Sequence, residues 1–303
     1  MFILTWFPRF WDWLLDRLLN SLSKSYFPDL RPEWKLRPAP SSAVCPPLTA
    51  DGLYSALSSG FAEPVGPVSQ VTGAKTVQLA DGRILSDIDT IIYCTGYDFD
   101  VPFTPKEYNP YPVVGEPPRL YRNTFPLSPD PEIRNSLVFL GQVGVAFPGF
   151  VQHELVAMAV SQIWRSKASL PSLEDMESWY RRYITWRNEI KSRHEAKSTF
   201  YTAFVPFVDH IKWLDETAGT GLFSHFGWFS LRAWRLWWED RELYTKVLYG
   251  LFSPSAWRLF DLDRRKPWSQ ARRQVLLDNE IAMAQRNRRA EWQKQEEDKK
   301  KGA

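Results

Sequence analysis

The chain has 303 residues, of which 44% are hydrophobic, as expected of a globular protein with one large domain or two modest ones. Thirty-eight basic and thirty-five acidic residues give a formal net charge of only +3, so the overall charge shows no nucleic-acid footprint and nucleic acid is not an expected partner. The two cysteines, Cys45 and Cys94, exclude a disulfide framework and fit a reducing intracellular, cytoplasmic location.

An amphipathic helix is predicted over residues 6–22. Its apolar face consists of Phe7, Phe10, Trp11, Leu14, Leu18 and Leu22. Charged residues and Pro8 interrupt the stretch, so it predicts neither a membrane-spanning helix nor a signal peptide. A core helix is the favoured interpretation, because the polar face is not rich in Lys or Arg. Two alternatives stay open: residues 1–22 make peripheral membrane contact, or the apolar face has lost its partner.

A β-hairpin is predicted after a proline-rich connection over residues 25–50 and a short helix over residues 48–60. Residues 77–85 alternate apolar and polar side chains around Asp81-Gly82. This dipeptide favours a type I′ turn, in which both central residues have positive φ.

A buried strand is predicted over Ile91–Cys94, within the run that ends in Thr95, Gly96 and Tyr97. Its continuous apolar character is typical of a parallel strand covered on both faces, with Cys94 as a small buried residue. Ligands in open α/β sheets lie just beyond the carboxyl ends of strands. We therefore expect a ligand or a domain joint at Thr95–Tyr97.

The second half of the chain is predicted to be mainly helical. A second buried strand over residues 137–140 is stopped by Gly141. Helices are expected over residues 154–164, from a capping-box-like start at Ser172, over residues 241–251, and from residue 269 to a charged end. Three tryptophans precede the helix predicted over residues 241–251, and we interpret them as core or interface residues: Trp234, Trp237 and Trp238.

No catalytic side-chain constellation is recognisable. The four histidines stand far apart, without metal-ligand spacing, and there is no nucleophile elbow. The sequence therefore assigns neither a catalytic residue nor a metal site.

Five runs of sequence resemble, in the same order, the C-terminal portion of the flavin-containing monooxygenases. They are Trp34–Pro40, Asp89–Tyr97, Phe139–Val143 with Phe147-Pro148 and Glu154, Leu170–Met176, and Tyr249-Gly250 with Ser253-Pro254 and Arg258-Leu259. Cys94 stands where the family usually has alanine. The resemblance covers roughly residues 30–275, and five motifs in order are far more specific than any one of them.

The resemblance implies an FAD- and NADPH-dependent oxidoreductase similar to N,N-dimethylaniline monooxygenase. In that family NADPH reduces FAD, and a hydroperoxide at the flavin C4a position oxygenates a soft nucleophile such as an amine or sulfide. The cofactor therefore supplies the chemistry without a catalytic triad. By the same resemblance Thr95, Gly96 and Tyr97 match the joint between nucleotide domains, and Gly141 and Gln142 match a segment beside the flavin. We predict these five residues to be cofactor-binding.

Neither Gly-x-Gly-x-x-Gly loop of that family is present. The closest spacing, Gly219-Thr-Gly221, is followed by Ser224 and predicts a plain loop. The expected fold is therefore α/β, an incomplete FAD/NAD(P)-binding sheet region with a hairpin and parallel strands, followed by a largely helical C-terminal part. The expected domains are a helix over 1–24, a partial nucleotide-binding region over 25–150, a helical region over 151–275 and a tail over 276–303. A truncated monooxygenase is the first interpretation; a non-catalytic scaffold module of the same descent is the alternative.

Overall fold

The computed structural model describes residues 8–27, 29–34, 36, 52–94, 100–113, 115–144, 149–193, 203–226 and 230–302. The chain forms two compact units. The helical unit comprises residues 118–187 and 203–303 with the start of the chain up to Trp11, and the sheet unit comprises residues 12–117 and 188–202. The predicted mixture of helix and sheet is confirmed. The predicted parallel strands are not found in the described residues, where both sheets are antiparallel.

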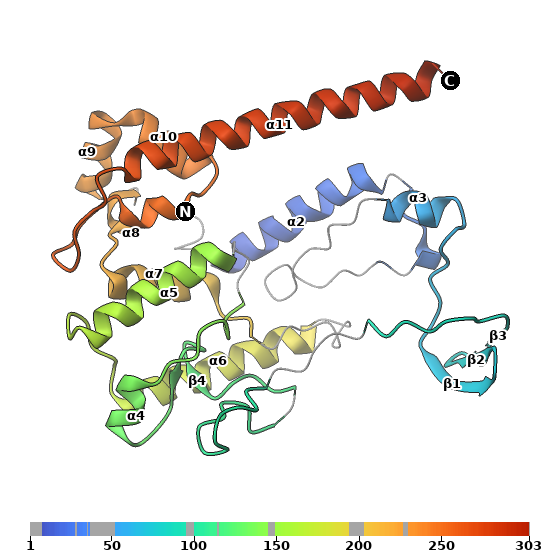
Figure 1. Cartoon of the computed structure of the whole chain (residues 1–303), viewed down its shortest axis with the longest axis horizontal. Helices are drawn as coiled ribbons and strands as arrows, with labels where there is room; N and C mark the ends of the chain where they lie inside the picture. The colour runs from blue at the N-terminus through green and yellow to red at the C-terminus, as the bar shows by residue number, and fades with distance from the viewer. Residues whose placement is uncertain are drawn as a thin grey trace. The chain divides into compact units, whose positions relative to one another are not determined.

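The sheet unit contains most of helix α2 and a small three-stranded sheet (Figure 1). In chain order its elements are α2 (Pro8–Tyr26), the 3-10 turn η1 (Pro32–Trp34), α3 (Leu53–Ser58), β1 (Val68–Gly73), β2 (Thr76–Leu79) and β3 (Ile84–Leu85). Val77 and Leu79 on β2 are buried, whereas Thr76 and Gln78, which alternate with them, are partly exposed, which is the period of two expected of a half-buried strand.

The predicted hairpin is confirmed as β2 and β3, but its turn is of another type. Leu79 N–H donates to the Arg83 carbonyl at 2.8 Å, which closes a three-residue loop. Gly82 has a φ of +88°, whereas Asp81 does not have a positive φ. Three-residue loops need only their last residue in the left-handed region, so the type I′ prediction is wrong.

The predicted buried strand over Ile91–Cys94 is wrong. These residues form no strand, the side chain of Ile92 is 80% exposed, and Cys94 is exposed rather than buried. The last main-chain bond that ties this segment to the sheet runs from Ile88 N–H to the Lys75 carbonyl. A parallel strand is buried only when strands and helices flank it, and no described element of the sheet unit does so.

Helix α2 forms as predicted and continues to Tyr26. Two residues of its apolar face, Leu18 and Leu22, are at least half exposed, so the core interpretation is wrong for this part of the helix. An apolar helix stripe becomes buried only to the extent that another apolar surface packs against it. Of the described helices, none combines the length and the apolar character needed to cross a membrane.

The helical unit carries two short strands and most of the helices. Its elements are β4 (Leu120–Tyr121), β5 (Phe125–Pro126), α4 (Pro131–Ser136), α5 (Gly149–Trp164), α6 (Leu173–Arg193, whose last residues leave the unit), α7 (Phe207–Ala218), α8 (Leu222–Phe226), α9 (Leu231–Glu239), α10 (Arg241–Tyr249), the 3-10 turn η3 (Pro254–Arg258) and α11 (Ala271–Gly302). The predicted helices are confirmed, although α5 starts five residues earlier than expected, at Gly149. Ser172 caps α6 by accepting from Asp175 N–H at 3.2 Å.

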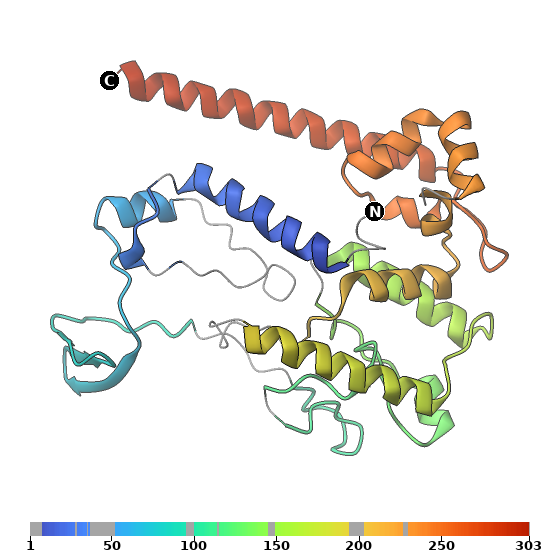
Figure 2. The same cartoon turned by 180° about the vertical axis from the view of Figure 1, so that it is seen from behind.

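The core of this unit lies between α5 and α7, which run side by side in both views (Figures 1 and 2). Ala159 and Ala218 are completely buried, and such small side chains allow the two helix backbones to approach closely. Trp257 of η3 fills the space beside α5, and its indole N–H donates to the Val151 carbonyl at 3.2 Å. The core therefore depends on contacts between residues about a hundred positions apart.

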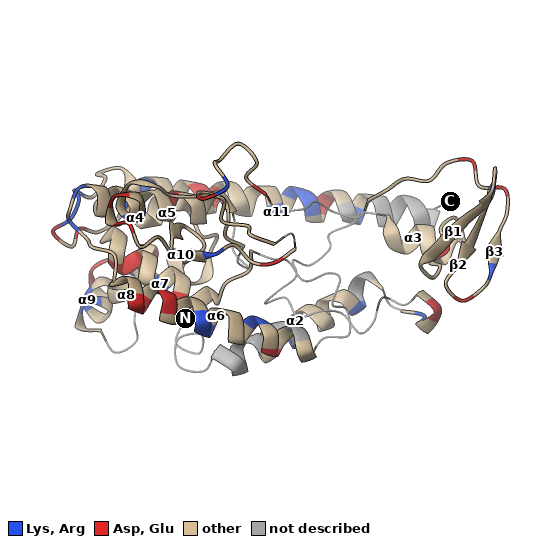
Figure 3. Ribbon diagram, turned by 90° about the horizontal axis from the view of Figure 1, so that it is seen from below, with Lys and Arg blue, Asp and Glu red and all other residues tan. Residues whose placement is uncertain are grey.

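Two further predictions concern loops and the end of the chain. Gly219 ends α7 in the left-handed region, so the Gly219–Gly221 stretch is a loop, as predicted. The described part of α11 that follows residue 285 carries interspersed basic and acidic residues (Figure 3). The second predicted strand, over residues 137–140, is wrong: these residues form no strand, and Leu140 is exposed.

Candidate functional site

Gly141 and Gln142 lie in a bend whose two ends are anchored by main-chain hydrogen bonds. Before the bend, Phe139 N–H donates to the Thr124 carbonyl at 2.9 Å. After it, Gly144 N–H donates to the Ala203 carbonyl at 2.8 Å. Anchors on both sides hold the short connection in place, so its residues project from a fixed base.

Gly141 occupies its position for a conformational reason. Its φ is +86°, a region that residues with a Cβ seldom adopt, and a Cβ placed there would meet no atom of the described residues within 4 Å. The space beside this backbone is therefore open. Leu140 immediately before it is exposed, and Gln142 after it is partly buried and takes part in an interaction. The bend presents bare backbone next to an exposed apolar side chain.

A buried three-residue connection between β4 and β5 supports the bend. Arg122 and Asn123, its first two residues, have φ of +55° and +50°, as the central residues of a type I′ turn do, and Thr124 N–H donates to the Tyr121 carbonyl at 3.0 Å. The Asn123 side-chain amide donates to the Ala203 carbonyl at 3.0 Å. This is the same oxygen that accepts from Gly144 N–H, so the turn and the bend share one acceptor.

Arg122 is enclosed by aromatic rings. Its guanidinium carbon lies 5.6, 5.0 and 5.3 Å from the ring centroids of Tyr121, Trp179 and Trp213. It forms an ion pair with Asp209, whose carboxylate also accepts from the Trp179 indole N–H at 3.2 Å. Cation–π contacts and the carboxylate together compensate the removal of this charge from water.

His210, next to Asp209 in the sequence, is completely buried, and neither ring nitrogen has a hydrogen-bond partner among the described residues. Burial, and then the nearby positive charge of Arg122, lower the pKa of His210 from 6.5 to about 3. The imidazole is therefore neutral in the folded protein at neutral pH. It is a structural member of the buried cluster and not a proton donor.

This buried histidine predicts a loss of stability in acid. The unfolded chain takes up the proton below pH 6.5 whereas the folded chain resists it until about pH 3, so acid favours unfolding throughout that window. Between about pH 8 and about pH 5 the histidine should remove about 2 kcal/mol from the free energy of unfolding. Urea unfolding across this range, for the wild type and His210→Gln, measures the difference. Parallel pH profiles for the two proteins would contradict the assignment.

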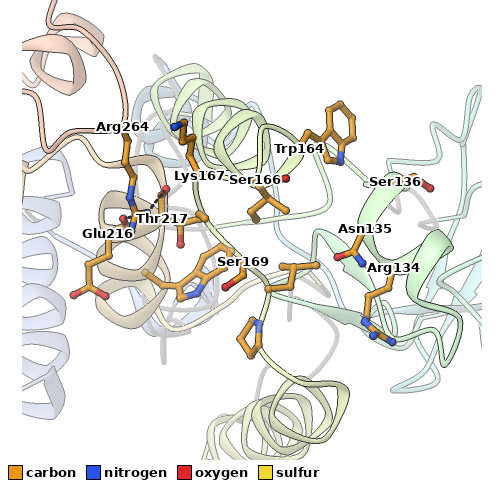
Figure 4. A pocket seen from close by; sticks show the side chains of 15 residues that line it. Arg134, Asn135, Ser136, Trp164, Ser166, Lys167, Ser169, Glu216, Thr217 and Arg264 are labelled. Atoms are coloured by element: carbon orange, nitrogen blue, oxygen red, sulfur yellow. Dashed lines mark hydrogen bonds between the residues drawn. The ribbon is translucent and has the colours of Figure 1, made fainter.

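An open cleft of about 1110 Å³ lies on the helical unit between the ends of α4, α5 and α7 (Figure 4). Both arginines that line the cleft donate hydrogen bonds to main-chain carbonyls of the protein. Arg264 donates to the carbonyls of Glu216 and Thr217 at 2.8 and 2.9 Å, and Arg134 donates to the Ser128 carbonyl at 2.7 Å. Neither Gly141 nor Gln142 lines the cleft. We therefore regard the arginines as helix-end and loop supports and assign no ligand to the cleft.

Of the five predicted cofactor residues, Thr95, Gly96 and Tyr97 lie outside the described residues. Gly141 and Gln142 are described, and their assignment to a cofactor stays a prediction. Among the described residues, no group of three or more histidine, cysteine, aspartate or glutamate side chains could hold a metal ion. Sequence reasoning missed the supporting residues Arg122 and Asn123; an asparagine that tolerates positive φ between two apolar pairs was the available signal.

Comparison with known proteins identifies the class. The flavin-binding monooxygenase-like family matches residues 5–299, and the chain belongs to this family. The resemblance drawn from the motifs is thereby confirmed.

Relatives with curated names are monooxygenases. Monooxygenase aurF of Gibberella zeae is 29% identical over 284 residues, which are 90% of this chain and 52% of that protein. Flavin-containing monooxygenase 3 of Homo sapiens is 25% identical over 271 residues, 88% of this chain and 44% of the relative. Dimethylaniline monooxygenase [N-oxide-forming] 2 of Cavia porcellus is 26% identical over 267 residues, 87% and 44% respectively. The chain thus spans about half the length of the curated relatives it matches.

Proposed function

We propose that this chain is the substrate- and flavin-side part of an FAD- and NADPH-dependent monooxygenase that oxygenates a small soft nucleophile such as an amine or sulfide. The observation that carries the proposal is the family match over nearly the whole chain, residues 5–299. The oxygenation of amines is suggested by the N-oxide-forming relative.

The residues of the bend are compatible with one wall of a flavin site. Open space beside the Gly141 backbone allows a planar ring to approach closely, and exposed Leu140 adds apolar surface. A dinucleotide also needs a cradle for its pyrophosphate, normally a Gly-x-Gly-x-x-Gly loop at a helix N-terminus. The 303 residues contain no such loop, so they supply a wall of the site and not the phosphate cradle.

When bound, FAD with NADPH and O₂ supplies the oxygen-transfer chemistry. The residues of this chain would position the flavin and enclose the reacting groups. The anchored bend holds its backbone at a fixed place, and the buried Arg122–Asn123 turn keeps that place constant. A site that contributes to the reaction by positioning its ligands, and not through an ionisable side chain, needs rigid support of this kind.

Substituting Gly141 with alanine should weaken flavin retention. At a φ of +86° alanine costs about 1 kcal/mol of stability, and its methyl group enters the open space beside the bend. Gly82→Ala is a matched control, because Gly82 has a φ of +88° and equally open surroundings in the β2–β3 turn. Both variants should lose similar stability, and only Gly141→Ala should lose flavin, measured by visible absorbance of the complete gene product. Equal flavin content in the two variants would remove Gly141 from the site.

The proposed activity is tested on the endogenous protein. An antibody against α6 (Leu173–Arg193) isolates it, and its mass, its flavin content and its NADPH consumption with dimethylaniline are then measured. We expect bound flavin and NADPH oxidation that yields the N-oxide. A pure protein without flavin would contradict the proposal and leave the scaffold interpretation in its place.

A further inference from the structure

Strand β1 (Val68–Gly73) forms an uncovered edge of the three-stranded sheet. The strand order is β1-β2-β3, so β2 pairs with one side of β1, and no described strand pairs with the other side (Figure 3). All six residues of β1 are exposed, whereas two of the four residues of β2 are buried. The outer side of such an edge strand presents a row of unpaired main-chain N–H and C=O groups.

The sequence of β1 lacks the side chains that usually protect an edge strand. Edge strands are commonly guarded by a charged side chain or a proline within the strand, and Val-Ser-Gln-Val-Thr-Gly contains neither. The opposite edge, β3 (Ile84–Leu85), has only two residues, and a very short edge strand is itself protected from pairing. The sheet can therefore be extended at β1 and not at β3.

The apolar face of the sheet continues onto this edge. Val68 lies opposite Leu79 in the β1–β2 pair, and Val71 lies opposite Val77. Directly opposed residues share a face of the sheet, so both valines of β1 are on the side where Val77 and Leu79 are buried. The side chains of Val68 and Val71 are nevertheless 54% and 61% exposed. A strand added beside β1 would pair with its backbone and cover these two valines.

The spacing of the two valines selects the strand that fits. In a regular strand, residues on one face are two positions apart. Val68 and Val71 share a face although they are three positions apart, because the register shifts between Val68 and Gln70, as it does at a β-bulge. A regular extended peptide does not match this spacing. A second copy of β1 that runs antiparallel has the same spacing, and it places Val68 of each copy opposite Val71 of the other.

We propose that a second copy of this chain pairs with β1, antiparallel and about a two-fold axis, and joins the two three-stranded sheets into one. Each copy contributes the same residues to such a contact. The Val68–Val71 pair forms twice, and Ser69 of each copy lies opposite Gln70 of the other. Because β1 has no charged residue, no like charges meet along it. Pro67, just before β1, has no N–H and keeps the paired stretch short, so the dimer is weak and reversible.

Analytical ultracentrifugation of the full chain over a range of concentrations measures the association. We expect a reversible shift of the mass from 35.4 kDa towards twice that value as the concentration rises. Val71→Lys should weaken the dimer at least about tenfold, because it places a charged side chain on the paired edge. The matched control is Ile84→Lys, the same change at a residue of β3 that is 63% exposed, and this variant should dimerise within about twofold of wild type.

Cysteine cross-linking tests the register and does not depend on how well β1 tolerates a lysine. Val68→Cys and Val71→Cys are made separately in a chain that carries Cys45→Ser and Cys94→Ser. Directly opposed residues have Cα atoms about 4.5–5.5 Å apart, within the reach of a disulfide. Mixing the two variants under mild oxidation should therefore give an intermolecular disulfide between positions 68 and 71. Either variant alone should give none, because its own cysteines are three residues, about 10 Å, apart along the paired strands.

Several results would overturn the proposal. One is a wild-type chain that stays at 35.4 kDa at every concentration. If the β1 amides of that monomer are also protected from hydrogen exchange, another segment of the same chain covers the edge. A dimer that Val71→Lys leaves intact, or that Ile84→Lys weakens equally, has its contact elsewhere. A disulfide that forms in Val71→Cys alone would show a different register, and the match between the valines would be wrong.

Discussion

Replacing Asn123 with alanine is expected to lower the free energy of unfolding by about 3 kcal/mol. Asn123 is completely buried, and its amide donates to the Ala203 carbonyl, the oxygen that also anchors the end of the Gly141–Gln142 bend. Alanine removes this bond, leaves a small void, and must adopt a φ of +50° without the local compensation that asparagine offers. Urea unfolding measures the loss.

Asn123→Gly separates the two causes. Glycine also removes the hydrogen bond but adopts positive φ freely, so it should cost about 1 kcal/mol less than alanine. Proteolysis should cleave near residues 140–144 faster in both variants, because both lose the amide that shares the acceptor of Gly144 N–H. If the two variants unfold at the same urea concentration, backbone strain at Asn123 contributes nothing. If neither accelerates cleavage, the turn does not support the bend.

Local sequence patterns predicted the helices and the β2–β3 hairpin. Ser172 before an acidic first turn is a cap that acts within a few residues, and Leu155, Ala159 and Ile163 repeat at helical spacing. Such signals need no information from distant parts of the chain, and the corresponding helices α5 and α6 are present. The same holds for the turn at Gly82, although the loop length, and with it the turn type, depends on strand register.

The two strand predictions were wrong for a shared physical reason. Ile91–Cys94 and Leu137–Leu140 have the composition of buried strands. A segment forms a strand, however, only when a neighbouring strand pairs with its backbone and other elements pack on its side chains. In the described residues, Phe139 finds a single acceptor on Thr124, and Ile92 faces solvent. An apolar composition indicates that a segment could be buried. It does not show whether the fold places other strands or helices beside that segment.

The buried support of the candidate site was beyond sequence reasoning because its members are far apart along the chain. Asn123 and Ala203 are joined across eighty positions, and Arg122 and Asp209 across eighty-seven. Neither pair shows a local spacing that marks it, and the aromatic cage around Arg122 draws on three separate elements. By contrast, Gly141 was assigned to the site through the family resemblance, and this assignment stays a prediction. The local signal, a glycine that ends an apolar run, predicted only a break in the chain at this position.

The Arg122–Asp209 pair predicts an asymmetry between its two partners. The Arg122 side chain is 7% exposed and the Asp209 side chain is 55% exposed. Asp209→Ala leaves a guanidinium buried without its counter-charge, and this should cost about 3 kcal/mol, the lower end for a broken buried pair because the surrounding rings still hold the cation. Arg122→Met removes the buried charge and keeps much of the volume, while Asp209 stays hydrated, so it should cost only about 1 kcal/mol.

A double-mutant cycle in urea unfolding measures both values. Once Arg122 is methionine, removing Asp209 as well should add little, because the carboxylate then has no buried charge to compensate. The double variant should therefore be more stable than Asp209→Ala alone. If Arg122→Met proves the more damaging single change, the guanidinium acts mainly through its contacts with Tyr121, Trp179 and Trp213, and the carboxylate is secondary. Additive losses would show that the two side chains stabilise the protein independently, with no energetic coupling across the pair.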